Sequence, residues 1–522
     1  MFTSRVRCRA RKHNCILRML ASLPIFGLCL SIALGVVEGR AAPNIILVAK
    51  EVSLGEIPHD IQVDRLFASP DSSRVACVGK RGEKWLVLVD GTAGPEYDDI
   101  PKHVPIFSPD SKRVAYIAQR RGQWHFVIDG AEDGGYDHYF GPVFSPNSRR
   151  VAYGAARDDK WFVVVDGSRG KKYDDIACLP KFSPDSKRIA YAATGKQKLR
   201  VIVDGVEGKA YDTIGEESIV FSPDSRRVGY AAQRGRKWHV VVDGVEGSPH
   251  DAIMWGTPLF SPDSRRVMYA AKVGTENIVF VDGVAAEERG TGAGSGMTFS
   301  PDSRRAAYSV ERDGEFFVVV DGSKGDLVDG ITDPGLFFSP DSKHLAYSAT
   351  RGDKGFVVLD GAEDSDFDGI GNGAFAFSPD SKRLGYIARR GDKWFFVVDG
   401  VPEREYDGIT GGRASFFSPN SKRVAYAAKQ GAKWLSVVDG KEGRQYDGFA
   451  LRTPTFSPDS KHVVSVVLQA ESLGIVVDGV EGPKYDTFVA GSQVVFDSPN
   501  AFHALAIRGR EVLRVEVKIV ER

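Results

Sequence analysis

The sequence predicts an all-β protein made of tandem β-propellers, with about twelve four-stranded antiparallel blades. A Phe-Ser-Pro-Asp-Ser turn motif recurs along the chain, and a Val-Asp-Gly motif follows the copies in constant phase. A period in this range is typical of solenoids, propellers and arrays. Successive turn serines are 37 to 41 residues apart: Ser69, Ser108, Ser145, Ser183, Ser222, Ser261, Ser300, Ser339, Ser378, Ser418, Ser457 and, in a degenerate copy, Ser498.

Each repeat contains the elements of one blade, as its third copy shows. A first strand ends at Phe144, and the Ser-Pro-Asn-Ser that follows is a turn, since proline fixes φ and asparagine accepts local hydrogen bonds. Residues 151–155 and 161–165 form the second and third strands, which are rich in β-branched and aromatic residues. An Asp-Gly turn leads into a fourth strand around Tyr173 and Ile176. Four short strands per repeat predict a propeller blade.

The repeat resembles a known family. Its F-S-P-D-S-x-R-V-A-Y stretch is similar to the Pro-Asp variety of WD-type propeller repeat, which is found in periplasmic TolB and in the propeller domains of prolyl-oligopeptidase-type peptidases. The resemblance covers essentially the whole mature chain and implies the fold, whereas function has to be argued from a site. The chain departs from the family in having Ser after Pro-Asp, and in its Trp-x-Val-Val-Val-Asp-Gly segment.

Twelve turns can form two six-bladed rings or one twelve-bladed ring. We expect two rings, residues 42–286 and 287–522, because a glycine-rich segment replaces the usual fourth strand between the sixth and seventh turns. Residues 57–66 would then complete blade six, and residues 287–297 would complete blade twelve. Such closure would remove exposed sheet edges. A single twelve-bladed ring is the alternative.

The first forty residues predict export. Several arginines precede an apolar run at 19–37, and small residues at Gly39 and Ala41 suggest cleavage after Ala41. Residues 1–41 are therefore predicted to be a signal peptide, and the protein to be periplasmic or extracellular. The alternative is that the apolar run remains as a membrane anchor.

Composition excludes few classes of function. The chain has 69 basic and 69 acidic side chains, so net charge does not draw it to nucleic acid, and no nucleic-acid partner is expected. No histidine or cysteine spacing indicates a metal, and no cofactor or catalytic residue is predicted. Cys77 and Cys178 remain after cleavage, and we expect two unpaired, largely buried thiols. The alternative is a disulfide between them, which export would permit.

The two faces of the disc differ in variability between repeats. The Ser-Pro-Asp-Ser and Asp-Gly turns lie on one nearly constant face, while the second-to-third and fourth-to-first connections form a variable loop face on the other side. Loops on a rigid scaffold commonly bind partners. The candidate partner-binding residues on the variable loop face, basic and aromatic, are Arg120, Arg121, Tyr139, Arg234, Arg236, Trp255, Arg389 and Arg390. The repeated tryptophans of the third strands are expected to pack between blades.

These features predict an exported, non-catalytic binding protein for a protein, peptide or glycan, and the basic loops suggest an anionic partner. There is no Gly-x-Ser-x-Gly nucleophile motif. One alternative is a propeller lyase or hydrolase that acts on an anionic polysaccharide. The other is a structural or spacer element at the cell surface.

Overall fold

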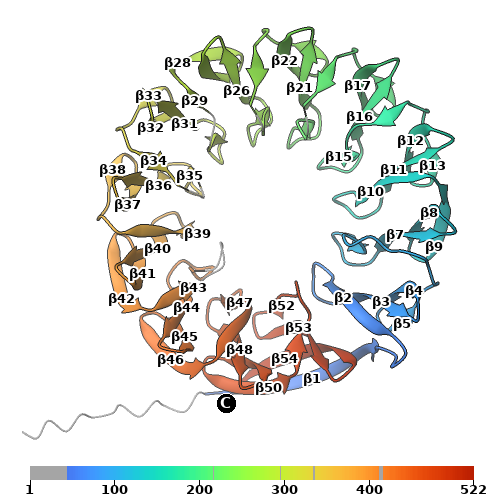
Figure 1. Ribbon diagram of the computed structural model, residues 1–522. Coiled ribbons are helices and arrows are strands. Elements are labelled where there is room, and N and C mark those ends of the chain that lie inside the picture. The colour runs from blue at the N-terminus through green and yellow to red at the C-terminus, as the bar shows by residue number, and fades with distance from the viewer. Residues whose placement is uncertain (1–43, 216, 255, 294–295, 333–334, 411–415) are drawn as a thin grey trace, which may run out of the picture. The chain divides into compact units, whose positions relative to one another are not determined.

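The computed structural model describes residues 44–522, except 216, 255, 294–295, 333–334 and 411–415. The described residues belong to one compact unit, Pro43–Arg522, and the predicted signal peptide lies outside them. Within the described residues every secondary-structure element is a β-strand. The strands form twelve antiparallel sheets, which we number as blades 1 to 12 (Figure 1). The predicted all-β fold of about twelve propeller blades is confirmed.

We call a first strand continuous where it is one strand and split where two short strands take its place; each occurs in half of the blades. In blades 2 and 10 the single strand is short, and an isolated bridge, Asp99–Gln119 or Phe417–Val424, forms the rest of the pairing. The continuous first strands are β2 (Gln62–Ala68), β6 (Ile106–Phe107), β10 (His138–Phe144), β39 (Gly369–Phe377), β43 (Gly408–Thr410) and β47 (Gly448–Phe456). The split ones are β14 (Asp175–Ile176) with β15 (Lys181–Phe182), β19 (Thr213–Ile214) with β20 (Val220–Phe221), β24 (Ala252–Ile253) with β25 (Leu259–Phe260), β29 (Gly292–Ala293) with β30 (Thr298–Phe299), β34 (Gly330–Ile331) with β35 (Phe337–Phe338), and β51 (Thr487–Phe488) with β52 (Val495–Ser498).

The second and third strands form the central hairpin of every blade. The second strands are β3 (Val75–Arg81), β7 (Val114–Arg120), β11 (Val151–Arg157), β16 (Ile189–Gly195), β21 (Val228–Arg234), β26 (Val267–Val273), β31 (Ala306–Arg312), β36 (Leu345–Arg351), β40 (Leu384–Arg390), β44 (Ala425–Gln430), β48 (Val463–Gln469) and β53 (Ala501–Arg508). The third strands are β4 (Lys84–Val89), β8 (Gln123–Ile128), β12 (Lys160–Val165), β17 (Lys198–Val203), β22 (Lys237–Val242), β27 (Glu276–Val281), β32 (Glu315–Val320), β37 (Lys354–Leu359), β41 (Lys393–Val398), β45 (Lys433–Val438), β49 (Ser472–Val477) and β54 (Glu511–Glu521).

The fourth strands vary most in length. They are β5 (Thr92–Ala93), β9 (Ala131–Tyr136), β13 (Ser168–Arg169), β18 (Val206–Glu207), β23 (Val245–Glu246), β28 (Val284–Gly290), β33 (Ser323–Lys324), β38 (Ala362–Glu363), β42 (Val401–Tyr406), β46 (Lys441–Tyr446), β50 (Val480–Tyr485) and, in blade 12, β1 (Ile45–Glu56). In the third copy the expected extent was wrong: Tyr173 makes an isolated bridge with Trp161, and Ile176 belongs to the next blade. The chain leaves the outer edge at Asp174, whose N–H donates to Thr194 O of β16.

The repeated polar residues join neighbouring blades. In blade 5 the Ser222 hydroxyl donates to Asp224 Oδ1 (2.6 Å), and the Asp224 N–H donates to Ser264 Oγ of blade 6 (2.9 Å). The Arg227 guanidinium donates to Asp243 of its own blade (3.0 Å) and to the Ser264 carbonyl of the next (3.3 Å). We call the face that carries these turns the Ser-turn face. Its motif is a turn cap and a cross-blade link, as the repetition predicts.

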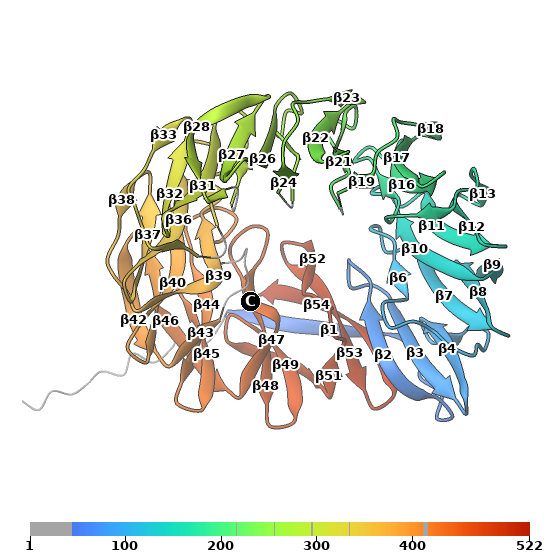
Figure 2. The same ribbon diagram turned by 45° about the horizontal axis from the view of Figure 1, so that its top comes forward.

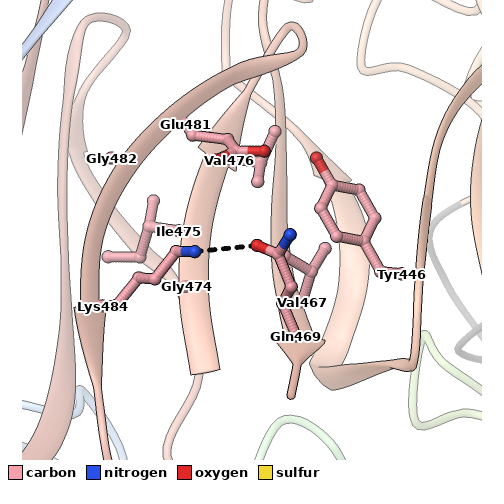
Figure 3. Close-up of a pocket in the computed structure, with 9 residues that line it drawn as sticks. All are labelled: Tyr446, Val467, Gln469, Gly474, Ile475, Val476, Glu481, Gly482 and Lys484. Atoms are coloured by element: carbon pink, nitrogen blue, oxygen red, sulfur yellow. Dashed lines mark hydrogen bonds between the residues drawn. The ribbon is translucent and has the colours of Figure 1, made fainter. Parts of the chain in front are cut away.

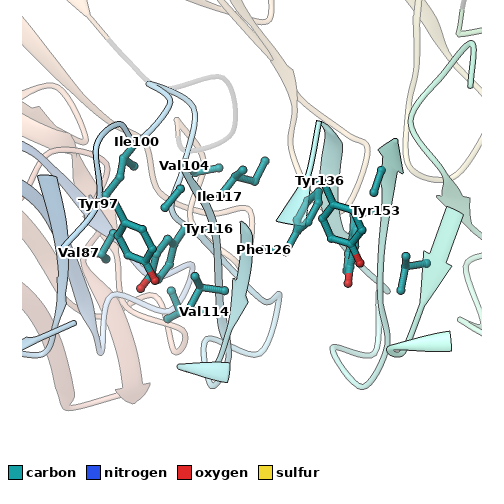
Figure 4. Packing of buried hydrophobic residues seen from close by; sticks show 14 of the residues in the cluster. Val87, Tyr97, Ile100, Val104, Val114, Tyr116, Ile117, Phe126, Tyr136 and Tyr153 are labelled. Atoms are coloured by element: carbon teal, nitrogen blue, oxygen red, sulfur yellow. The ribbon is translucent and has the colours of Figure 1, made fainter. Parts of the chain in front are cut away.

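Aromatic side chains fill the space between blades. In blades 1 to 3 the cluster includes Tyr97, Tyr116, Phe126, Tyr136 and Tyr153, all buried (Figure 4). Tyr97 packs edge-on against Tyr116 of the next blade, with ring centroids 6.2 Å apart, and Tyr136 packs in the same way against Tyr153 (6.5 Å). The core is therefore shared between blades, so each blade stabilises its neighbours.

The chain closes at a different place than the sequence analysis expects. Strand β1 pairs with β54 from Ile45–Glu521 to Glu56–Glu511 and so completes blade 12, and the two strands lie side by side in Figures 1 and 2. Residues 57–66 do not complete blade six, because β2 is the first strand of blade 1. Residues 287–297 do not complete blade twelve, since β28 lies in blade 6 and β29 in blade 7.

Blades 6 and 7 are joined like other neighbours. Asp263 N–H donates to Ser303 Oγ across this junction (2.8 Å), and Gln493 N–H donates to Ser72 Oγ between blades 12 and 1 (2.8 Å). A Cβ on Gly290 would lie 1.9 Å from the Glu311 carbonyl oxygen, so glycine permits a close backbone approach there. The expected boundary between residues 286 and 287 falls within β28. These contacts favour the single twelve-bladed ring over two six-bladed rings.

The third strand of blade 11, β49, has glycine at a position where the third strands of the other blades have a side chain. Gly474 of β49 lines a narrow surface hollow, too small to hold a water molecule, together with Tyr446 and Val467 (Figure 3). Beside it Lys484 Nζ donates to Gln469 Oε1 (2.8 Å). The corresponding residue in blade 10 is Leu435, which is buried.

We expect Gly474→Ala to raise the melting temperature by about 1–3 °C, because glycine inside a strand costs about 0.5–1 kcal/mol relative to alanine. A Cβ at residue 474 meets Lys484 Cγ at 3.4 Å, an ordinary contact. Thermal unfolding of the parent chain and of Gly474→Ala measures the shift. A lower melting temperature for the alanine variant would contradict the prediction.

Candidate functional site

The variable loop face is held rigid by repeated aspartates. Between blades 4 and 5, Asp212 Oδ2 accepts from the Gly235 N–H at the tip of the next hairpin (2.7 Å), and its other oxygen pairs with Lys198. The bond with Lys198, followed by the bond from Gly235, lowers the pKa of Asp212. The same backbone bond recurs at Asp98, Asp137, Asp174, Asp251, Asp329, Asp368, Asp407, Asp447 and Asp486. Loop variation is therefore carried on a fixed framework.

Two candidate arginines are bound within the fold. Arg234 Nη2 lies 2.7 Å from Glu246 Oε1, and its guanidinium lies over the Tyr211 ring of the previous blade, 5.1 Å from the centroid. The Tyr211 hydroxyl donates to the same Glu246 (2.9 Å). Arg120 makes the equivalent contacts with Glu132 and Tyr97. These arginines join blades, so their charge is largely compensated.

The other candidate arginines divide into two groups. Arg389 donates to the carbonyls of Gly391 (2.9 Å) and Asp368 (3.3 Å), and Arg390 lies over the Phe367 ring (5.1 Å). Arg121 and Arg236 are exposed, and within the described part of the chain neither side chain has an ion-pair partner. The structure therefore leaves two of the six candidate arginines free for a partner, and these two lie on different blades.

Of the two aromatic candidate residues, Trp255 and Tyr139, the structure describes only Tyr139. Trp255 lies outside the described residues. Tyr139 is half-buried at the start of β10, its ring centroid 4.5 Å from that of Trp124 and 6.4 Å from that of His103. Burial, together with the charge of Asp99, raises the pKa of Tyr139, so its phenol stays neutral.

Tyr139 belongs to a group of rings around blade 3. We call this group the aromatic patch: His103, Trp124, His138, Tyr139 and Trp161. His138 is exposed and near-parallel to Trp161, with centroids 6.0 Å apart and an interplanar angle of 15°. His103 is also exposed, while the two tryptophans are half-buried. The patch therefore presents part of its ring surface to solvent on the variable loop face.

Strand register explains how the patch forms. His138 pairs with Ala156, and Ala156 pairs with Trp161, so the two rings lie on one side of the sheet with a small side chain between them. Tyr139, the next residue, points to the opposite side of the same sheet, where it meets Trp124 of blade 2. The patch thus has two parts, one on each side of blade 3.

The patch occurs where the chain departs from its own repeat. After the aspartate of the cross-blade bond, other blades have a small or acidic residue and then most often isoleucine, as in Asp212-Thr213-Ile214 and Asp368-Gly369-Ile370. Ile214 is buried. Blade 3 has Asp137-His138-Tyr139 instead: His138 is exposed, and Tyr139 is half-buried against the core cluster of blades 1 to 3.

Other features of the described residues do not form a second exposed aromatic group of this kind. A groove of about 520 Å³ lies between blades 1 and 2 on the Ser-turn face, but its arginines Arg74 and Arg113 are engaged in cross-blade bonds. No group of metal-binding side chains was found among the described residues, and none of them forms a helix that could span a bilayer. Cys77 and Cys178 are free thiols, and burial raises the pKa of each.

Comparisons with known proteins give no family. No family model and no curated protein matches the chain. Similar solved structures include a eukaryotic initiation factor (15% identity, 66% of this chain and 94% of that chain, TM-score 0.34). TolB from Acinetobacter baumannii (11%, 54% and 82%, 0.23) and hydrazine synthase from Kuenenia stuttgartiensis (13%, 59% and 97%, 0.25) are also among them. At these TM-scores they carry no argument on function, and the fold rests on the sheets described above.

Sequence reasoning found Tyr139 but missed its neighbours. Trp124 and Trp161 share the repeat position of the other tryptophans, which favoured a core role, and both do pack against buried clusters. The signal that could have found the patch is the replacement of the usual short residue and isoleucine by His138 and Tyr139. The contact with His103 could not be found, because it depends on the path of a loop from another blade.

Proposed function

We propose that this protein is an exported, non-catalytic binding protein that holds a macromolecular partner on the variable loop face of blades 2 to 4. The observation that carries the proposal is the aromatic patch. It is partly exposed, departs from the repeat, and stands on loops that cross-blade bonds hold in place. Clustered aromatic rings with polar tips are typical of binding surfaces.

The basic loops support this function less than the aromatic patch does. Neutralising Arg234 or Arg120 would remove cross-blade contacts with Glu246 or Glu132, so a loss of binding in such a variant would be ambiguous. Substitution of His138 and Tyr139 reduces this ambiguity, because most other blades have a small or acidic residue and then isoleucine at these two positions.

The exported location is part of the same proposal. It rests on the basic and apolar order of residues 1–41 and on the small residues before Pro43. Fractionation of producing cells, with N-terminal sequencing of the mature chain, tests it directly. A mature chain that begins at residue 42 in the envelope or the medium would support export.

We expect the mature chain to capture a partner from the cell envelope or the medium, and the double variant His138→Thr/Tyr139→Ile to lose it. This variant restores the Thr-Ile pair of blade 5. Captured proteins and glycans are both identified, and the melting temperatures of the two chains are compared to confirm equal folding. Equal capture by the two chains would overturn the assignment of the binding face.

A further inference from the structure

We propose that the aromatic patch binds an uncharged oligosaccharide chain, with one sugar ring stacked on each side of blade 3. This proposal rests on the proposed function and names the ligand class for the same site. A pyranose ring has C–H groups on its faces and hydroxyls around its edge. It therefore fits a flat ring surface that is surrounded by hydrogen-bonding groups.

The patch provides two such surfaces. On one side of blade 3, Tyr139 and Trp124 are in contact, with centroids 4.5 Å apart, and His103 lies at the edge. On the other side, His138 and Trp161 form a near-parallel pair over Ala156. Since His138 and Tyr139 are neighbours in one strand, a ligand that reaches both surfaces must pass over the end of β10. An extended chain of sugars can do this, and a monosaccharide cannot.

Polar groups for sugar hydroxyls surround both surfaces. The exposed imidazoles of His103 and His138 can donate or accept. Asp99 Oδ1 accepts from the Ile100 N–H (2.9 Å) and Asp137 Oδ2 accepts from the Asp158 N–H (3.0 Å), so both carboxylates are oriented and each keeps free lone pairs. Oriented donors and acceptors beside ring faces provide specificity at low cost in conformational entropy.

The charges around the patch favour an uncharged ligand. Lys102 and Arg121 are equal in number to Asp99 and Asp137. The blade 3 hairpin has two exposed carboxylates at 158–159, while its Lys160 is paired with Asp174. An anionic polysaccharide would meet these carboxylates without an excess of basic groups, which disfavours it. This result departs from the anionic partner that the basic loops suggest.

The test titrates the full mature chain with defined oligosaccharides by calorimetry. The probes are gluco-, xylo-, manno- and N-acetylchito-oligosaccharides of one to six units, with oligogalacturonate as the anionic comparison. The variants are His138→Thr/Tyr139→Ile and Trp161→Leu, since leucine stands at the same position in blade 4 as Leu199. Trp238→Leu is the matched control, because Trp238 has the same repeat position in blade 5, away from the patch.

We expect an uncharged series to bind more tightly as its length increases, with affinity at least about tenfold weaker in both patch variants and unchanged in Trp238→Leu. This factor corresponds to the loss of one stacking contact. Binding of none of the uncharged series, or equal binding by patch variants and parent, would overturn the proposal. If the envelope capture nevertheless gives a protein partner that depends on Tyr139, the proposed function holds and only the glycan assignment fails.

Discussion

A chain that begins at residue 57, and so lacks β1, is expected to melt at least about 10 °C lower than a chain that begins at residue 44, and to aggregate. Strand β1 contacts both sides of the closing junction. Ile45 is buried in the core cluster shared by blades 11 and 12, and Leu47 is partly buried against it. Glu51 accepts from Tyr485 of blade 11 (2.9 Å) and from Arg508 (2.7 Å). Each buried aliphatic side chain contributes about 1.5–3 kcal/mol, and about 1 kcal/mol corresponds to 2–4 °C in a domain of 150–250 residues.

The lost strand also leaves an open edge. Strand β54 pairs with β1 over almost its whole length, so deletion exposes a row of unpaired N–H and C=O groups. Gel filtration with light scattering and thermal unfolding of the two chains measure both effects. The variant Leu47→Ala keeps the strand and should lose stability by about 1 kcal/mol without forming oligomers, because Leu47 is only partly buried. Equal melting temperatures and a monomeric shorter chain would contradict this role of β1.

The fold could be predicted because every blade repeats the same local sequence motifs. The Ser-Pro-Asp-Ser turn, the Asp-Gly turn and the apolar strands between them act within about 40 residues, and repetition makes the pattern visible. The closing strand could not be predicted in the same way. Its partner β54 is more than 450 residues distant, and an antiparallel pairing of two chain ends leaves no periodic signal. The same lack of signal explains why residues 57–66 were wrongly expected to complete a blade.

The candidate site could be predicted only in part. Hairpin arginines such as Arg234 look like a basic face in the sequence, because the glutamate and tyrosine that bind them come from other strands. Tyr139 was visible as a departure from the repeat. Its contacts with Trp124 and His103 depend on the packing of blade 3 against blade 2, which no spacing along the chain reports.

The Ser-turn face predicts a steep loss of stability in acid. In its turns a serine hydroxyl, and in most copies the backbone N–H that follows, donate to the aspartate. In Asp341 these bonds, with that of Ser339 the strongest, lower the pKa from 3.8 to about 2. The pKa is lowered for the same first cause in six further turns: Asp110, Asp185, Asp224, Asp263, Asp302 and Asp380.

The lowered pKa values make the stability of the folded chain depend on pH. A carboxylate with a lower pKa in the folded chain takes up protons more readily when the chain unfolds, so stability rises with pH through this window. The contribution of these turns is complete above the unfolded value of about 4 and is lost as the pH falls toward about 2. Since seven such turns contribute, we expect the melting temperature to fall between pH 4.5 and pH 2.5.

The chain itself supplies the variant that tests this origin. Asn147 and Asn420 occupy the aspartate position in two blades and accept the same serine bond at 2.8 Å without a titrating group. The triple variant Asp224→Asn/Asp263→Asn/Asp302→Asn should therefore keep its melting temperature near pH 7 and show a shallower fall in acid, with up to three fewer protons bound on unfolding. The matched control is the triple variant Asp159→Asn/Asp313→Asn/Asp353→Asn, whose aspartates are exposed at hairpin tips. It should leave the slope of melting temperature against pH in acid unchanged. If both triple variants shift the slope equally, the effect comes from overall charge and not from the Ser-turn carboxylates.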